Sequence, residues 1–72
     1  MSVETFIPPS SSHIESVDYD DESEDLVFKF VSGDSGMYRN VPRATVRAMT
    51  QSMSWGGFMH RQLKGRYPYE RL

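Results

Sequence analysis

The chain has no cysteine, and in a protein of 72 residues that absence limits the fold more than any motif does. A domain of this size buries only about 60% of the surface that its unfolded chain exposes, so small scaffolds often depend on disulfides or bound metals. Without thiols, disulfides, thiolate zinc sites and cysteine nucleophiles are all excluded. We therefore expect a single domain with one thin hydrophobic core and no enclosed catalytic cleft.

The clearest predicted element is a strand over residues 26–31. Leu26, Phe28 and Phe30 occupy every second position, so their side chains share one face of that strand. The acidic stretch before it, residues 20–25, has a length that suits a hairpin loop. We therefore expect the strand to pair with one that precedes the loop.

Two further strands are predicted on either side of this one. Within residues 13–19, Val17 and Tyr19 alternate, whereas Ile14 is out of phase, as a β-bulge or the start of the strand would produce. A short strand over residues 37–41 follows a Gly-Asp-Ser-Gly turn. The three strands together are expected to form an antiparallel meander.

Two helices are predicted after Pro42, because proline is favoured at the first helical position. Residues 43–51 are rich in helix formers, and Val46, Met49 and Met53 make one apolar stripe. The second helix is predicted to follow a serine cap and to end at a glycine, over residues 55–65. The order of elements predicts an α+β fold of two layers, a three-stranded antiparallel meander followed by two helices packed on one face.

The N-terminal segment contains two prolines followed by three serines, a composition that is typical of a mobile arm. We predict a flexible arm over residues 1–11, a single domain over 12–69 and a short tail over 70–72. The apolar residues of the arm either become ordered on a partner or lie against the edge of the domain. These residues are Val3, Phe6 and Ile7.

Residues 33–36, Gly-Asp-Ser-Gly, have the letters that surround the nucleophilic serine of trypsin-like proteases. A serine nucleophile needs a base within hydrogen-bond reach and an oxyanion hole, and nothing in the sequence places His13 or His60 beside Ser35. Glycines at both ends suit a hairpin turn, so we interpret the motif as a turn and expect no enzyme. The acidic loop lacks the glycine of an EF-hand, so we expect neither a metal nor another cofactor.

No targeting signal is visible. No apolar run approaches the roughly 20 residues of a membrane-spanning helix, and the N-terminus has no basic region followed by an apolar one. The absence of cysteine suits a reducing compartment. We predict a cytoplasmic monomer that does not contact membranes.

The charges are divided between the two halves of the chain. Residues 1–35 carry nine acids and one base, and residues 36–72 carry seven bases and one acid, which gives net charges of −8 and +6. Such asymmetry indicates electrostatic partners. The alternative is that a compact fold mixes the two halves and largely cancels the difference.

Several short motifs in order resemble those of the KTSC domain, a family named for the C-terminus of some lysyl-tRNA synthetases. The resemblance covers about residues 10–69. The matching pieces are Ser12-His13-Ile14, Tyr19-Asp20, Leu26-Val27-Phe28-Lys29-Phe30, Gly36-Met37-Tyr38, Val41-Pro42, Ser54-Trp55-Gly56-Gly57-Phe58 and Gly65-Arg66-Tyr67.

The resemblance implies no established catalysis, and an RNA-binding role has been suggested for the family. The family's central motif has two tyrosines separated by one residue, but here Asn40 replaces the second tyrosine after Tyr38 and Arg39. His60 stands where the family often has asparagine. These departures leave any role of the motif in ligand binding open.

The first hypothesis is a small non-enzymatic regulator that binds a larger protein. In length and layout the chain is similar to a small phage-encoded inhibitor of host RNA polymerase. This similarity implies that the partner is host RNA polymerase and that binding inhibits or redirects transcription. It also implies that the protein is located in the host cytoplasm. The predicted partner-binding residues are Val3, Glu4, Phe6, Ile7, Arg43 and Arg47.

The second hypothesis is a nucleic-acid-binding module, in which basic side chains contact phosphates and aromatic side chains stack on nucleobases. From the sequence, Trp55 is either a core residue or an exposed contact residue. The predicted nucleic-acid-binding residues are Arg39, Arg43, Arg47, Trp55, Arg61, Lys64 and Tyr67.

Overall fold

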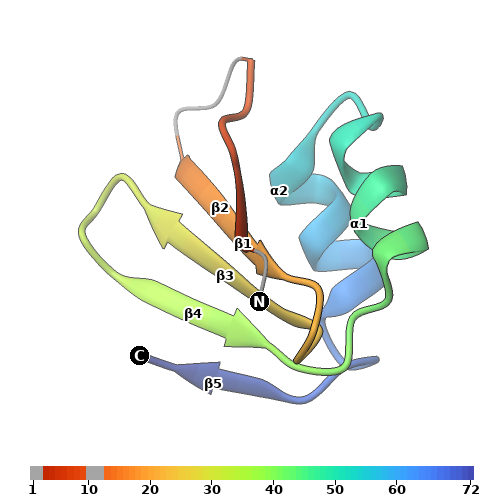
Figure 1. Ribbon diagram of the computed structural model, residues 1–72. Helices are drawn as coiled ribbons and strands as arrows, with labels where there is room; N and C mark the ends of the chain where they lie inside the picture. Colours follow the sequence, from red (N-terminus) through yellow and green to blue (C-terminus); the bar gives the residue numbers. More distant parts are fainter. Residues whose placement is uncertain (1–2, 10–12) are drawn as a thin grey trace.

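The computed structural model describes residues 3–9 and 13–72. A five-stranded antiparallel sheet, in the order β1-β2-β3-β4-β5, is covered on one face by the helices (Figure 1). The π-helix η1 directly continues α2, and β5 follows it at the edge of the sheet. The elements are β1 Val3–Phe6, β2 Ile14–Asp20, β3 Asp25–Phe30, β4 Ser35–Tyr38, α1 Arg43–Thr50, α2 Trp55–Phe58, η1 Met59–Leu63 and β5 Tyr69–Arg71.

The α+β class and the helices on one face are as predicted, but the three-stranded meander is wrong, because the sheet has five strands. Strand β1 lies in the segment predicted as an arm and pairs with β2, with Phe6 opposite Val17. Strand β5 includes most of the predicted tail and pairs with β4, with Tyr69 opposite Tyr38. Both edge strands are too short to show a clear alternation, and pairing with a neighbouring strand stabilises them.

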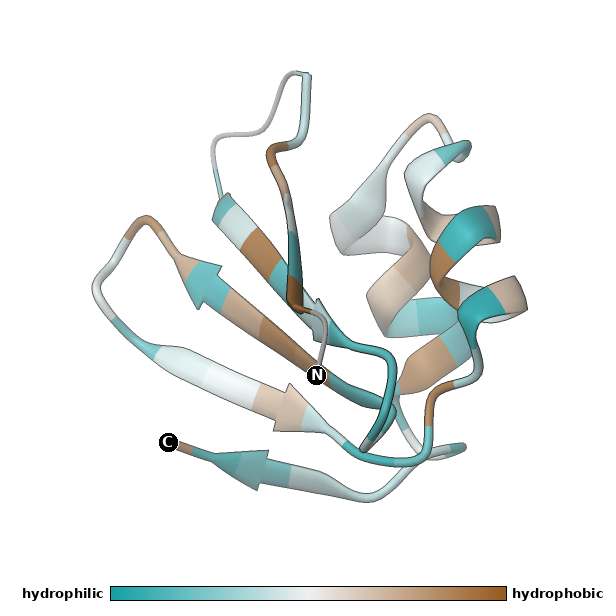
Figure 2. Cartoon of the chain, in the orientation of Figure 1, coloured by the Kyte–Doolittle hydropathy of each residue, from teal (hydrophilic) through white to brown (hydrophobic). Residues whose placement is uncertain are grey.

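The central hairpin confirms the predicted alternation. Val17 lies opposite Phe28 and Tyr19 opposite Leu26, and all four side chains are buried. Brown and teal bands alternate along β2, whereas β3 contains a continuous hydrophobic stretch over residues 26–28 (Figure 2). The register shifts just after Ile14, which confirms the predicted irregularity and brings Ile14 onto the buried face.

Helix α1 begins after Pro42, whose carbonyl accepts hydrogen bonds from the N–H groups of Thr45 and Val46. Val46 and Met49 face the sheet and are buried, as predicted. The helix ends before Met53, however, so Met53 lies outside the apolar stripe and is fully exposed.

The ends of the second helical segment have the predicted caps. The side chain of Ser54 accepts a hydrogen bond from the N–H of Gly57 at 3.1 Å. Gly65 has a φ of +82°, the left-handed conformation that ends a helix and that glycine adopts most easily. Between them, Leu63 is fully buried against the sheet.

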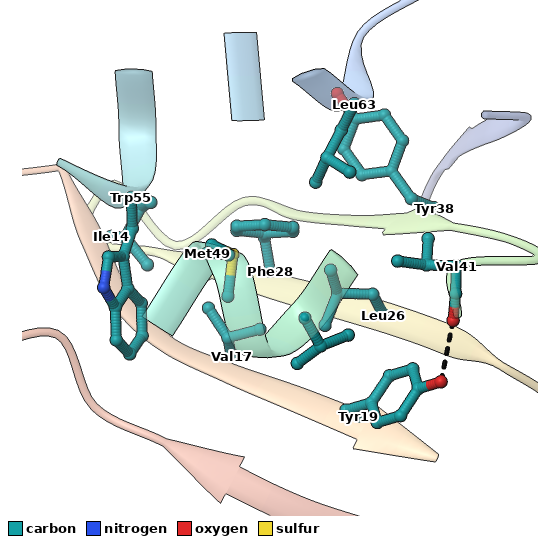
Figure 3. Close-up of a cluster of buried hydrophobic side chains, with 11 residues drawn as sticks. Ile14, Val17, Tyr19, Leu26, Phe28, Tyr38, Val41, Met49, Trp55 and Leu63 are labelled. Atoms are coloured by element: carbon teal, nitrogen blue, oxygen red, sulfur yellow. Dashed lines mark hydrogen bonds between the residues drawn. The ribbon is translucent and has the colours of Figure 1, made fainter. Parts of the chain in front are cut away.

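The connection between β4 and α1 is fixed at Val41, which is fully buried (Figure 3). The hydroxyl of Tyr19 donates to the carbonyl of Val41 at 2.7 Å. The N–H of Val41 donates to the carbonyl of Glu24 at 2.9 Å. Both backbone polar groups of Val41 are therefore satisfied inside the core, and α1 starts from a fixed position.

Trp55 belongs to the core, which decides between the two roles considered from the sequence. Its side chain is 7% exposed and lies beside Ile14 in the buried cluster (Figure 3). Among the described residues, no helix has the length and apolar character needed to cross a membrane.

Candidate functional site

The helix layer contains only positive charges. No acid occurs between Asp34 and Glu70, so α1, α2, η1 and the turns that join them carry bases alone. The acids all belong to the sheet and its turns, so the helix layer carries no negatively charged residue of its own. The bases of the helix layer are Arg43, Arg47, Arg61, Lys64 and Arg66.

Bases on the sheet are paired with acids, whereas most bases of the helix layer are not. Within residues 3–9 and 13–72, Arg43 is the one base of the helix layer that forms an ion pair. The helix layer therefore presents positive charge that the described part of the chain leaves uncompensated. The pairs on the sheet are Lys29 with Asp18, Arg39 with Glu70 and Arg71 with Asp34.

Arg43 joins three parts of the molecule. Its guanidinium donates to Glu4 of β1 at 2.6 Å and to Asp21 of the β2–β3 turn at 2.9 Å, and it lies 5.6 Å from the ring centre of Tyr19. The hydrogen bond to Glu4, followed by that to Asp21, raises the pKa of Arg43 above its ordinary value. These contacts connect the edge strand to the start of α1.

A depression of about 210 Å³ lies between β1 and α1. Its lining includes Glu4, Phe6, Arg43 and Arg47, so four of the six residues predicted to bind a protein partner come together here. The other two remain exposed nearby on the chain, Val3 at 59% and Ile7 at 74%. We call these residues the β1–α1 surface: Val3, Glu4, Phe6, Ile7, Arg43 and Arg47.

The bases predicted to contact nucleic acid do not converge on one surface. Arg47 lines the depression beside β1, whereas Lys64 lines a separate pocket beside β4 and β5. Arg61 folds back over Gly57, where an added Cβ would lie 2.9 Å from its Nη1. Arg39 lies outside the helix layer and pairs with an acid of β5. A nucleic acid would have to follow the helix layer over several elements to contact them.

The two aromatic residues predicted to stack on nucleobases are instead packed largely inside the domain. Trp55 is buried, and its Nε1 has no hydrogen-bond partner within the part of the chain that the structure describes. Tyr67 is half-buried, with its hydroxyl 3.3 Å from Oγ1 of Thr45. Neither residue offers a freely exposed ring.

A different aromatic pair, which sequence reasoning missed, lines a pocket of about 300 Å³ between the sheet and the end of η1. The ring centres of Tyr38 and Tyr69 are 4.8 Å apart. The pairing of β4 with β5 places them opposite each other, and no local pattern in the sequence indicates that pairing. We call this the Tyr38–Tyr69 pocket; its lining residues are Tyr38, Met59, His60, Lys64, Gly65 and Tyr69.

Two buried tyrosines remain protonated donors at neutral pH. Desolvation, followed by the nearby charge of Glu24, raises the pKa of Tyr19 above 10.0. Desolvation, followed by the proximity of Tyr69, raises the pKa of Tyr38 in the same way. Tyr19 uses its hydroxyl within the core, whereas Tyr38 lines the pocket.

Comparison with known proteins agrees with this architecture. The crystal structure of a KTSC domain protein from Yersinia pestis superposes with a TM-score of 0.85 and 25% sequence identity, covering 99% of each chain. No curated protein matches the sequence. The sequence model of the KTSC domain matches residues 10–67, which is most of the chain. The protein therefore belongs to the KTSC domain family.

Proposed function

We propose that the protein is a non-enzymatic regulator that acts by docking on a larger protein through the β1–α1 surface. The observation that carries this proposal is the convergence of Glu4, Phe6, Arg43 and Arg47 around one depression. Val3 alternates with Glu4 and Phe6 along β1 and so faces away from α1; with exposed Ile7 it adds apolar area on the outer side of the same edge strand.

The size of the molecule permits this mode of action. A standard protein interface buries about 800 Å² on each partner. The described surface is 4640 Å², so such an interface would occupy roughly a sixth of it. The guanidinium of Arg47, which has no ion pair within the described residues, would meet an acidic group, and the apolar side chains would supply the buried centre. Host RNA polymerase stays the predicted partner.

Titration against purified bacterial RNA polymerase, followed by biolayer interferometry, tests the proposal. The double substitution Arg47→Glu and Ile7→Ser, which alters both the depression and the exposed apolar edge, is expected to weaken binding at least tenfold. Val31→Ser is the matched control, because Val31 is 58% exposed but lies in the turn after β3, away from this surface. Circular dichroism confirms that each variant is folded.

Absence of binding by the wild-type protein would remove RNA polymerase as the partner. Equal binding by the control and the double variant would show that the β1–α1 surface is not the contact. The two results are distinct, since the first concerns the partner and the second the surface.

The second candidate function, binding of single-stranded nucleic acid, is favoured by one observation: four bases of the helix layer have no acidic partner within residues 3–9 and 13–72. If all four contact phosphates, the logarithm of the affinity should fall with the logarithm of salt concentration with a slope of about −3. Fluorescence anisotropy with a single-stranded RNA at several salt concentrations measures this slope. A slope near zero, or no binding tighter than about 10⁻⁴ M, would contradict this function.

A further inference from the structure

The Tyr38–Tyr69 pocket lies apart from the β1–α1 surface and contains a hydroxyl without a partner. Tyr38 is only 5% exposed, and its hydroxyl forms no hydrogen bond with any residue in 3–9 or 13–72. Its side chain extends from β4 towards Leu63 of η1, with the hydroxyl at the far end (Figure 3). Among the described residues, the fully buried side-chain polar atom without a partner is Nε1 of Trp55, so the Tyr38 hydroxyl still reaches solvent and is free to donate to a ligand that enters the pocket.

The charge around this hydroxyl is positive. Lys64 and His60 are exposed and line the same pocket, and the lining contains no acid. Lys64 forms no ion pair within the described ranges. The nearest acid in sequence, Glu70, follows Tyr69 on β5 and is paired with Arg39. An ammonium, an imidazole and a phenol hydroxyl are three donors from separate residues, which match the three terminal oxygens of a phosphate monoester.

The other side of the pocket offers a flat apolar surface. Tyr69 is 51% exposed, and its ring lies against Tyr38 with 50° between the ring planes. Gly36 makes this arrangement possible, because an added Cβ there would collide with the ring and hydroxyl of Tyr69. The remaining ring surface of Tyr69 is therefore held in place and open to stacking by a planar group. The volume of about 300 Å³ is at the small end for ligand sites and suits one nucleotide.

We propose that the Tyr38–Tyr69 pocket binds a nucleoside 5′-monophosphate group, with the base on Tyr69 and the phosphate held by Lys64, His60 and the hydroxyl of Tyr38. This inference is independent of docking through the β1–α1 surface. The group could be a free nucleotide or the 5′ end of a single strand. Both present the same base and phosphate to the pocket.

Nuclear magnetic resonance titration with AMP tests the site. Saturable amide shifts are expected at residues 38, 60, 64, 65 and 69, with an affinity tighter than about 1 mM. Adenosine and inorganic phosphate are expected to bind at least tenfold more weakly, since each lacks one half of the ligand. A 5′-phosphorylated single-stranded oligonucleotide and its 5′-hydroxyl counterpart distinguish the strand end from the free nucleotide.

Substitutions separate the pocket from general attraction to anions. Tyr38→Phe keeps the ring and removes only the hydroxyl, and Lys64→Gln removes the charge; each is expected to weaken AMP binding about tenfold, the effect of one charge-assisted hydrogen bond. Arg66→Gln is the matched control, because Arg66 is an unpaired base of the same layer that lines another pocket. The proposal would be overturned if AMP caused no saturable shifts or caused shifts centred elsewhere. It would also be overturned if Arg66→Gln weakened AMP binding as much as the two pocket substitutions do.

Discussion

Substitution of Tyr19 by phenylalanine tests how strongly one hydrogen bond fixes the start of α1. The change removes the hydroxyl that donates to the carbonyl of Val41 at 2.7 Å. Val41 is fully buried, so water cannot replace the lost donor without disturbing the core. Leaving a buried acceptor without a partner costs about 1–3 kcal/mol. A chain of this length is expected to have a free energy of unfolding of about 4–11 kcal/mol, so the loss is a large fraction of it.

Thermal unfolding and urea unfolding, both followed by circular dichroism, measure this effect. A loss of about 2 kcal/mol should lower Tm by roughly 8–16 °C in a domain of this size. Tyr69→Phe is the matched control, because it removes the same atom from a hydroxyl that has no hydrogen-bond partner within the described residues. The control should change stability by less than about 0.5 kcal/mol. Equal effects of the two substitutions would refute the role assigned to the Tyr19–Val41 hydrogen bond.

The same variant has an expected signature at high pH. Burial raises the pKa of Tyr19, so above about pH 10 the unfolded chain loses this proton while the folded protein keeps it. The unfolded state then binds fewer protons, and the free energy of unfolding falls as pH rises. Wild-type protein should therefore lose stability between pH 10 and the raised pKa, and Tyr19→Phe should show a shallower loss. Parallel pH profiles would contradict this assignment.

Two further predictions concern local packing. Met49→Ala should lower the free energy of unfolding by about 2–5 kcal/mol, because Met49 is fully buried. Met53→Ala should change the free energy of unfolding by less than about 0.5 kcal/mol, because Met53 is fully exposed. Urea unfolding of both variants checks the contrast. Gly65→Ala should lower the free energy of unfolding by about 1 kcal/mol, because φ is +82° at this position. Gly56→Ala should not lower Tm, because Gly56 has an ordinary φ and space for a Cβ. A larger loss of stability in Gly56→Ala than in Gly65→Ala would contradict the conformational argument.

The central parts of the fold were predictable from local pattern, and the edges were not. Leu26 and Phe28 alternate within a strand that is buried on one face, so the period of two is visible in the sequence. Strand β5 is exposed at all three positions and β1 at two of four, so neither gives a clear periodic signal. Their existence depends on hydrogen bonds to β4 and β2, which is information that only the tertiary structure contains.

The same distinction applies to the candidate sites. The bases of α1 were predictable as one face because Arg43 and Arg47 are four residues apart on a helix. Glu4 can pair with Arg43 only because β1 joins the sheet. In the same way, Tyr69 lies against Tyr38 only because β5 joins the sheet. Missing the edge strands therefore also meant missing the contacts that shape both surfaces.

The absence of acids from the helix layer gives the molecule chromatographic behaviour that its composition would not indicate. With an isoelectric point near 5.5, the protein should on average be repelled by a cation exchanger at neutral pH. A molecule that turns its helices towards a sulfonated or heparin-coated resin presents mainly unpaired cations, and local attraction then outweighs the net repulsion at low ionic strength. Retention on heparin by a protein of net charge −2 would be the simplest outward sign of this polarity.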